Sequence, residues 1–388
     1  MKDKIVQYVE EEYDAAVARR HYIHQHPELS FQEYKTTEYI ENLMKEWDIP
    51  YQRPASGTGL VAFIEGDTPG KTIAFRCDID ALPMQEETEV PFKSEQPDVM
   101  HACGHDMHTA NMLGFAHILS GHKELVKGKV KFLFQPAEEL FPGGARSLIA
   151  EGFLDDVDAV YGMHVNPMRT YDEISVRKGA ITAGSYVYKI RVIGQGGHGS
   201  NPSNAVDPVV AASAVVMALQ TIVSRNIHPR DTLVVSTCMI HGGTKGNIIP
   251  DFVDLEGQIR SYSESLAGMA QRKIREIAEG VCAGYGCRAE CVFEDGYAPV
   301  INHDAAVELV NRAFDKMYYA KLNVLEPELG GEDFAYYLRK TEGAFFHVGI
   351  RSAKEAPVIP QHNTHFLADD RALKTGMEAF LRILLEEE

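Results

Sequence analysis

The side chains with the clearest metal-binding chemistry lie in residues 101–108. This segment holds one thiol, three imidazoles and one carboxylate. Cys103 and His105 are two positions apart, so both can bind one metal ion, or one of them can reach a neighbouring ion. A thiolate or carboxylate can bridge two divalent ions, while neutral imidazoles suit the terminal positions. The segment therefore indicates a metal site.

A pair of glutamates, Glu138 and Glu139, follows the apolar segment 130–134. Adjacent side chains of an extended chain diverge, so one carboxylate can bind a metal ion while the other faces a water molecule. Such a carboxylate can accept the water's proton and pass it to a leaving nitrogen. Two ions held by Cys103, Glu139 and imidazoles would lower the pKa of that water toward about 7. Together the two segments favour a metal-dependent hydrolase over a structural zinc module.

Composition limits the partners that the protein can have. The chain has 388 residues and a net charge of -18, and this length favours two domains. A nucleic-acid partner is not expected, because phosphate binding requires a basic surface. The N-terminus lacks a signal-peptide pattern, and no run of about 18 apolar residues predicts a membrane span. The six cysteines lack the spacing of a disulfide framework, so a cytoplasmic location is the simplest expectation.

Helices and strands alternate over the first 182 residues. The predicted helices have apolar side chains at helical spacing, and the predicted strands alternate with period two. Asp106 is expected to be the N-cap of the helix that follows Cys103. This order is typical of a largely parallel α/β sheet, which binds ligands where its strands end, and His164 follows one such strand. The expected helices are 1–25, 32–47, 106–120 and 145–152, and the expected strands are 71–77, 130–134 and 158–163.

The middle of the chain has a different order of elements. Its pattern is βαββαβ, the ferredoxin-like arrangement, which forms a four-stranded antiparallel sheet with two helices on one face. We therefore expect 183–294 to be a lid or dimerisation domain inserted into a discontinuous catalytic domain, 1–182 and 295–388. The expected strands are 185–193, 232–240, 251–261, 288–294 and, after the insertion, 344–350; the expected helices are 208–225, 264–283, 332–339 and 369–388.

Eight motifs are spread over nearly the whole chain, and together they are specific. They occupy residues 20–28, 78–83, 101–108, 135–139, 162–164, 196–198, 247–250 and 330–334. The chain resembles the amidohydrolase branch of the aminoacylase and carboxypeptidase superfamily of dinuclear metallopeptidases. That branch includes N-acyl-amino-acid amidohydrolases, N-acetyldiaminopimelate deacetylases, hippurate hydrolases and plant auxin-conjugate hydrolases.

The resemblance implies roles for individual residues. Cys103 takes the place of an aspartate that bridges the metal ions elsewhere in the superfamily, and Glu138 matches the catalytic base. A histidine near the C-terminus matches the fifth ligand; His362 fits the family's His-x-x-x-Phe pattern, whereas His365 is expected to be a surface residue. The implied metal ligands are Cys103, His105, Glu139, His164 and His362.

Two aspartates match positions beside the metal ions. Asp80 corresponds to a carboxylate that positions a metal-binding imidazole, which makes physical sense because such support orients the ring. Asp78 stands where related enzymes have a metal-binding histidine. The alternative for both residues is a turn before Pro83.

His198, Asn247 and Arg260 match positions that hold substrate in relatives, and Gly331 is a further expected substrate residue, with a turn at the start of a helix as its alternative. His198 would polarise the scissile carbonyl, and Arg260 would pair with the substrate's carboxylate. Asn247 is implied as a substrate residue, and Gly331 would let the backbone approach the substrate. Asn247 as a turn residue and Arg260 as a surface cation are the alternatives. Many relatives also have a Pro-His pair where this chain has Pro202-Ser203, so no role for that second histidine is carried over.

The expected activity is hydrolysis of the amide bond of N-acyl amino acids, N-acetyl derivatives foremost. The expected cofactor is a pair of divalent ions, Mn²⁺ or Zn²⁺, with Co²⁺ and Ni²⁺ also suited to these ligands. A dipeptidase or carboxypeptidase breaks the same kind of bond and is an alternative. A metal-stabilised binding protein without turnover is an alternative of another class. A homodimer through the inserted domain is expected, because its sheet has edges to pair or cover.

Overall fold

The chain divides into two compact units in the computed structural model, which describes residues 3–387. The first unit runs through Ile181 and also contains Ile301–Glu326 and the segment from Asp333 onward. The second unit consists of Thr182–Val300 and Pro327–Glu332. Gly331 therefore belongs to the second unit. The α/β fold class with a mostly parallel central sheet, predicted from the order of elements, is confirmed.

An eight-stranded sheet forms the centre of the first unit, in the order β1-β2-β4-β3-β5-β16-β6-β15. β3 is parallel to β4 and β5, β16 is parallel to β5, and β15 is parallel to β6. The remaining neighbours are antiparallel. Of these strands, β1, β2, β6 and β15 were not predicted from the sequence. The strands are β1 (Tyr51–Gln52), β2 (Leu60–Glu65), β3 (Thr68–Asp78), β4 (Lys127–Gln135), β5 (Ala159–Thr170), β6 (Glu173–Val176), β15 (Lys321–Val324) and β16 (Glu342–Arg351).

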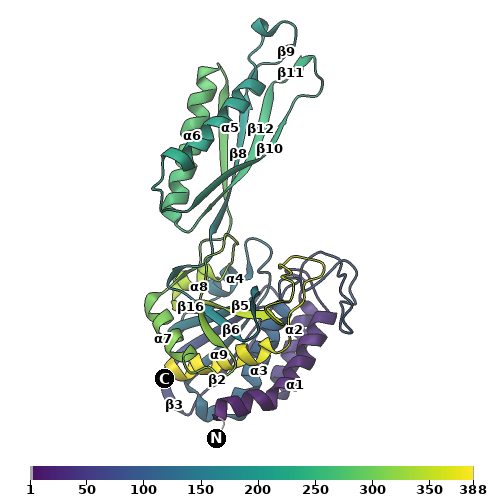
Figure 1. The fold of residues 1–388 in the computed structure, drawn as a ribbon, viewed down its shortest axis with the longest axis vertical. Helices are drawn as coiled ribbons and strands as arrows, with labels where there is room; N and C mark the ends of the chain where they lie inside the picture. Colours follow the sequence, from purple (N-terminus) through teal and green to yellow (C-terminus); the bar gives the residue numbers. More distant parts are fainter. Residues whose placement is uncertain (1–2, 388) are drawn as a thin grey trace. The chain divides into compact units, whose positions relative to one another are not determined.

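Helices α1, α3 and α9 cover one face of this sheet (Figure 1). α3 is buried almost all round, which explains why it is rich in Met, Ala and Leu. Aromatic rings join it to the sheet and to α9: Phe115 packs against Phe75 and Phe380. The helices are α1 (Lys4–Gln25), α2 (Tyr34–Glu46), α3 (His105–Gly121), α4 (Gly144–Ala150), α7 (Asp304–Phe314), α8 (Ala335–Lys340) and α9 (Ala372–Glu387); β7 (Gly179–Ala180) pairs with β14 (Ile301–Asn302).

Asp106 is not the N-cap of α3, so that prediction was wrong. Gly104 is the N-cap, with φ +89°, and no side chain caps the helix. Asp106 lies in the first turn, fully buried, and its Oδ2 atom is 3.0 Å from Arg20 Nε and 3.0 Å from His24 Nδ1. Arg20 and His24 lie one turn apart on α1, so both can contact Asp106. This shared contact explains the spacing of arginine and histidine in the motif at residues 20–28. The acidic residue therefore ties α1 to α3 instead of capping a helix.

Two other helices begin later than predicted, in each case because an acidic residue makes a different contact. The helix predicted from residue 332 begins at Ala335, because the buried Asp333 side chain binds Arg76 and Gln135. The last helix begins at Ala372, three residues later than predicted, since Asp369 binds Arg371 in the loop before it. In each case a tertiary or loop contact uses the carboxylate that the local pattern assigned to a helix.

The second unit is a four-stranded antiparallel sheet in the order β10-β12-β8-β13. α5 and α6 lie side by side on one of its faces (Figure 1). This is the ferredoxin-like arrangement expected from the βαββαβ order. Its elements are β8 (Gly184–Ile193), α5 (Pro208–Arg225), β10 (Leu233–Gly242), β12 (Phe252–Ser261), α6 (Glu264–Gly284) and β13 (Arg288–Asp295), with a small ladder of β9 (Gly197–His198) and β11 (Ile248–Ile249).

One helix, α5, is long and apolar enough to cross a membrane when judged by length and composition alone. One side of α5 packs into the core of the second unit through Ala211, Val215, Leu219 and Ile222. Its outer side exposes Val210 and, more strongly, Met217. The helix is therefore apolar on both sides, although only one side contacts the core of this unit.

Candidate metal centre

Three adjacent parallel strands of the first sheet bring polar side chains to one edge. β3 ends at Asp78, and its neighbour β4 ends just before Glu138 and Glu139. β5, on the other side of β3, pairs with it as far as Gly162 and reaches His164 two residues later. Because the carboxyl ends of parallel strands meet at the same edge of a sheet, residues far apart in the sequence come together there.

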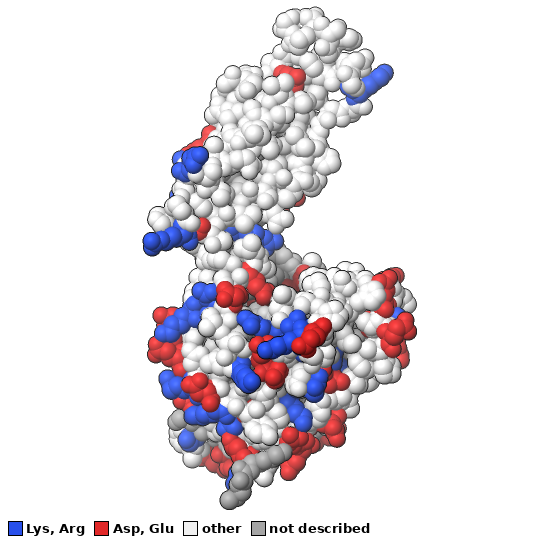
Figure 2. All heavy atoms as spheres, in the orientation of Figure 1, with Lys and Arg blue, Asp and Glu red and all other residues white. Residues whose placement is uncertain are grey.

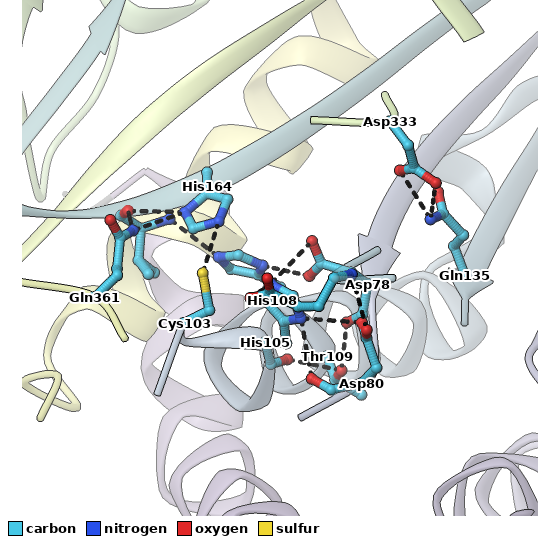
Figure 3. A network of polar contacts seen from close by, with 12 residues as sticks. Asp78, Asp80, Cys103, His105, His108, Thr109, Gln135, His164, Asp333 and Gln361 are labelled. Atoms are coloured by element: carbon cyan, nitrogen blue, oxygen red, sulfur yellow. Dashed lines mark hydrogen bonds and ion pairs between the residues drawn. The ribbon is translucent and has the colours of Figure 1, made fainter. Parts of the chain in front are cut away.

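The predicted metal ligands of the first unit lie close to one another. Cys103 Sγ is 3.5 Å from His164 Nε2 (Figure 3). Glu139 Oε1 is 3.1 Å from His362 Nε2 and 4.0 Å from His105 Nε2. Ligand atoms bound about 2.0–2.3 Å from a shared ion are separated by about 3–4 Å. The observed separations therefore suit divalent metal ions.

Two buried atoms at this position make no hydrogen bond of good geometry among the residues that the structure describes, although each faces an oppositely charged group at 3.1–3.5 Å. They are His105 Nε2 and Glu139 Oε1. Together with Cys103 Sγ they form a group whose ligand atoms all lie within 4.8 Å of one another. A buried polar atom without a well-formed hydrogen bond is costly, and a bound cation would remove that cost. The thiol, imidazole and carboxylate groups present are those that bind transition metals or zinc.

Hydrogen bonds fix which nitrogen each imidazole offers. His105 Nδ1 lies 3.0 Å from the Asp80 carbonyl oxygen and 3.2 Å from Asp80 Oδ1. His164 Nδ1 lies 2.9 Å from the Val165 carbonyl oxygen. With Nδ1 held at these carbonyl oxygens, Nε2 is the nitrogen of each ring that faces Cys103 or Glu139. It can bind an ion once any proton on it has been displaced. Asp80 thus stands where a carboxylate orients a ligand imidazole.

A second group of candidate ligands contains Asp78 and His108, in addition to His105 and His164. Both nitrogens of His108 are already used: Nδ1 contacts Asp78 Oδ1, and Nε2 accepts from the Val165 amide at 3.0 Å. Asp78 Oδ2 in turn accepts from Arg76 at 2.9 Å. His108 therefore holds the backbone next to His164 and does not offer a lone pair to an ion.

Sequence reasoning missed a buried network behind Asp78. Arg76 is fully buried in β3 and donates to Asp78, to Gln135 Oε1 and to Asp333 Oδ1 at 2.8–2.9 Å. Gln135 Nε2 also donates to Asp333 (Figure 3). A buried arginine requires such partners, because an unpaired charge in the interior is unfavourable. The only signal in the sequence was a charged residue inside an otherwise apolar strand.

The backbone around the ligands adopts left-handed conformations that few residues favour. Gly104 has φ +89°, and a Cβ atom there would lie 2.4 Å from Val165 Cγ2. Ala137, just before the glutamate pair, has φ +53°, and His362 has φ +60°. The His362 amide donates to the Ala102 carbonyl at 2.8 Å, which ties the C-terminal loop to the segment of Cys103. Strained non-glycine residues of this kind cluster at functional sites.

When no ion is bound, burial and the neighbouring charges shift the pKa values of the proposed ligands. Burial raises the pKa of the Cys103 thiol well above its usual range, and the charges of Glu139 and Glu138 add to the effect. Burial lowers the pKa of His105, but the charges of Asp78 and Asp80 outweigh it and raise the pKa to about 10. The contact with Glu139 raises the pKa of His362. The site therefore holds protons that a cation would displace.

The predicted substrate residues all lie in the second unit, where they form two separate pairs. His198 pairs with Ile248 between β9 and β11, and the Gly199 amide donates to the Asn247 carbonyl at 2.9 Å. Arg260 is the register partner of Ser185 at the start of β8. A Cβ atom on Gly331 would lie 3.8 Å from Ser185 Oγ. His198 and Asn247 lie beyond the other end of β8. A strand of this length places them about 30 Å from Arg260 and Gly331.

His365, the histidine that was expected to be a surface residue, is exposed, with 58% of its side chain accessible. Its Nδ1 atom lies 3.5 Å from Glu87 and not beside the predicted ligands. The neighbouring Thr364 carbonyl accepts from the Glu87 amide at 2.8 Å. The loop is therefore anchored on both sides of His362, by Ala102 before it and by Glu87 after it.

Comparison with known proteins shows the family. Residues 74–386 match the model of peptidase family M20/M25/M40. The chain is 38% identical to the N-acetylcysteine deacetylase of Bacillus subtilis over 93% of both chains. It is 37% identical to thermostable carboxypeptidase 1 of Saccharolobus solfataricus, over 96% of this chain and 95% of the relative.

A solved structure supports the same assignment. A Bacillus subtilis protein, described as a dinuclear metal binding peptidase from the M20 family, superposes with a TM-score of 0.86 and 34% identity over 97% of this chain and 98% of that one. The recognised motifs, the confirmed fold class and these relatives agree. The chain therefore belongs to peptidase family M20/M25/M40, and it is a hydrolase of that family.

Proposed function

We propose that this hydrolase cleaves the amide bond of N-acyl amino acids, N-acetyl derivatives foremost, and releases the free amino acid and a carboxylate. The observation that carries the proposal is the meeting of buried metal-binding atoms: Cys103, His105 and Glu139 offer ligand atoms within 4.8 Å of one another, and His362 Nε2 lies 3.1 Å from Glu139 Oε1. Relatives named as deacetylases and amidohydrolases support the choice of an N-acyl substrate.

Cys103, His105, Glu139, His164 and His362 would hold two divalent ions, Mn²⁺ or Zn²⁺, with Co²⁺ and Ni²⁺ also suited to the ligands. When bound, the ions supply a water of lowered pKa and polarise the substrate carbonyl. Asp80 would keep the proton on His105 Nδ1, so that Nε2 stays available to an ion.

Glu138 is the proposed general acid–base. It is buried, it precedes the ligand Glu139, and its charge acts on the nearby Cys103 thiol. Its carboxylate would accept the proton of the attacking water and then protonate the departing amine nitrogen. In the second unit, His198 would donate to the carbonyl oxygen as negative charge develops there. Arg260 would bind the carboxylate of the amino acid, with Asn247 and Gly331 also lining the substrate.

The test of this mechanism is the variant Glu138→Ala. Because Glu138 is proposed to move protons without binding an ion, metal content measured by elemental analysis should stay near that of the unaltered protein. Turnover of N-acetyl amino acids should fall by roughly a thousandfold or more. Near-normal turnover would remove Glu138 from the mechanism.

Two alternatives are separated by simple assays. A dipeptidase or carboxypeptidase would cleave free dipeptides faster than N-acetyl amino acids, and a carboxypeptidase among the relatives keeps this alternative open. A binding protein without turnover would be insensitive to a chelator in either assay. Loss of hydrolysis on chelation and its return with added metal would exclude that second alternative.

A homodimer through the second unit is also proposed. The outer side of α5 is apolar, and α5 has no charged side chain before Arg225. β10 is an edge strand of its sheet. Figure 2 shows few charged side chains over the part of the second unit that contains α5. An open strand edge next to an apolar helix face favours two-fold pairing with a second copy.

The separation of the two substrate pairs supports the same proposal. Arg260 lies beside the start of β8 and His198 follows the end of β8, about 30 Å away, so a small substrate cannot contact both in one copy of the second unit. A dimer would supply His198 from one copy and Arg260 from the other. A cytoplasmic location is proposed as well, because all six cysteines are free thiols, as expected in a reducing compartment.

A further inference from the structure

The loop that carries Glu138 is held from both sides by buried carboxylates. The Ala137 amide donates to Glu33 Oε1 at 2.8 Å. The Glu139 amide donates to Asp80 Oδ2 at 3.0 Å. These two amides flank Glu138 in the chain. Ala137 has φ +53°, a left-handed conformation that an alanine does not favour by itself, so an external contact is needed to keep it.

Glu33 stands at the position whose side chain ordinarily caps the start of the helix that follows. It is the N-cap residue of α2, yet its side chain makes no capping hydrogen bond there. Glu28 caps the helix in its place, because its Oε2 atom accepts from the Thr36 amide at 2.8 Å and from the Thr36 hydroxyl at 3.0 Å. The Glu33 side chain is therefore free to reach Ala137, which lies 104 positions away in the sequence.

The environment of Glu33 isolates this contact from water. The residue is completely buried. Burial raises the pKa of Glu33 to about 7, and the charge of Asp80 contributes in the same direction. The carbonyl oxygen of the neutral acid and an oxygen of the carboxylate can both accept from the Ala137 amide. A glutamine in this position would keep the same acceptor.

We propose that Glu33 is a positioning residue for Glu138: by binding the Ala137 amide, it holds the loop in the conformation that directs the Glu138 carboxylate toward the reacting water. The inference rests on the proposed role of Glu138. Asp80 holds the loop on the C-terminal side of Glu138, where it contacts both the Glu139 amide and the His105 ring. Glu33 therefore acts on the proton-transfer step, whereas Asp80 acts on metal binding.

The experiment compares Glu33→Ala and Glu33→Gln with the unaltered chain. Four quantities are measured: kcat and KM with the metal-reconstituted protein, the bound metal, and hydrogen exchange of a peptide spanning 135–140. Glu378→Ala is the control for loss of a buried carboxylate: Glu378 is also fully buried, accepts from the Tyr318 and Tyr319 amides at 2.9–3.0 Å and pairs with Arg382 at 3.1 Å. It lies on α9 and belongs to no part of the proposed site.

In Glu33→Ala, kcat should fall at least about tenfold while KM and metal content stay within about twofold. Exchange at 135–140 should become faster. In Glu33→Gln, kcat and the exchange rate at 135–140 should both stay close to those of the unaltered chain, since the acceptor is retained. Glu378→Ala should change neither. If Glu33→Ala does not fold, Glu33→Asp keeps the carboxyl group but shortens its reach to the Ala137 amide, and it should show the same direction of change.

Three results would overturn the inference. Unchanged kcat and exchange in Glu33→Ala would show that the contact positions nothing. A loss of metal in parallel with kcat would show that Glu33 acts on metal binding and not on the proton-transfer step. An equal loss of kcat in Glu378→Ala would show a general effect of buried carboxylates. If the unaltered chain hydrolyses no amide, the proposed function fails, but exchange at 135–140 still decides whether Glu33 orders the loop.

Discussion

At the scale of single residues, the proposed ligands compete for protons as well as for metal ions. The pKa of Cys103 is raised by burial and by neighbouring carboxylates, and the pKa of His105 lies at about 10 because Asp78 and Asp80 outweigh the effect of burial. Both groups are therefore protonated near neutral pH when no ion is present. A metal ion binds the deprotonated forms and must displace these protons.

We therefore expect metal affinity to weaken as the pH falls, and protons to be released when metal binds. The sign follows from the raised pKa values, since every proton that must leave costs more at lower pH. Calorimetric titration of the metal-free protein in two buffers of different ionisation enthalpy would count the released protons. Cys103→Ser should release fewer. Binding that is independent of pH between 6 and 8 would contradict the assigned ligands.

At the scale of elements, the start of α3 is the most constrained point of the site. Gly104 is the N-cap of α3 and separates Cys103 from His105 in the chain. Its φ of +89° and the 2.4 Å approach to Val165 leave no room for a side chain. Any shift of this residue would move two proposed ligands together, because they are its direct neighbours.

We expect Gly104→Ala to destabilise the protein by about 1–3 kcal/mol and to reduce the bound metal. Gly121→Ala is the matched control: Gly121 ends the same helix, and a Cβ atom there would meet nothing within 4 Å. Thermal unfolding of the metal-free proteins and elemental analysis would measure both effects. Equal behaviour of the two variants would show that the turn at Gly104 tolerates a side chain.

At the scale of the whole molecule, the second unit is expected to join two copies. Met217 on α5 is 72% exposed, and a charge there would be buried in the proposed interface at a high cost. Met217→Glu should therefore give a monomer in light scattering, whereas Tyr318→Glu, at an exposed residue of the first unit, should leave the mass unchanged. A monomeric unaltered chain would contradict the homodimer.

The same variants connect assembly with activity. If His198 reaches the substrate of the other copy, Met217→Glu should lose activity although its metal content is normal. A mixture of Glu138→Ala and His198→Ala subunits should regain part of the activity, because mixed dimers contain one site with both residues intact. Absence of any recovery, with mixed dimers shown to form, would place His198 and Glu138 in the same copy.

The order of the elements and the kind of chemistry to expect could both be predicted from local sequence patterns. The types and spacing of Cys103, His105 and the glutamate pair indicated metal-dependent hydrolysis, and hydrophobic periodicity predicted most helices and strands. These features are local: periodicity reports which face of an element is buried, and a motif reports which side chains are neighbours in the chain. The short strands β1, β6 and β15 lacked enough residues to show a period.

Which distant residues meet could be read only from the folded chain. In the fold, His362 lies beside Glu139, and Glu33 contacts Ala137. Asp106 pairs with Arg20 and does not cap a helix. His198 and Arg260 are separated by the length of β8. Such contacts depend on strand order and on the packing of helices around the sheet. No local pattern specifies them, because the free energy of each contact is realised only after the chain has brought both partners together.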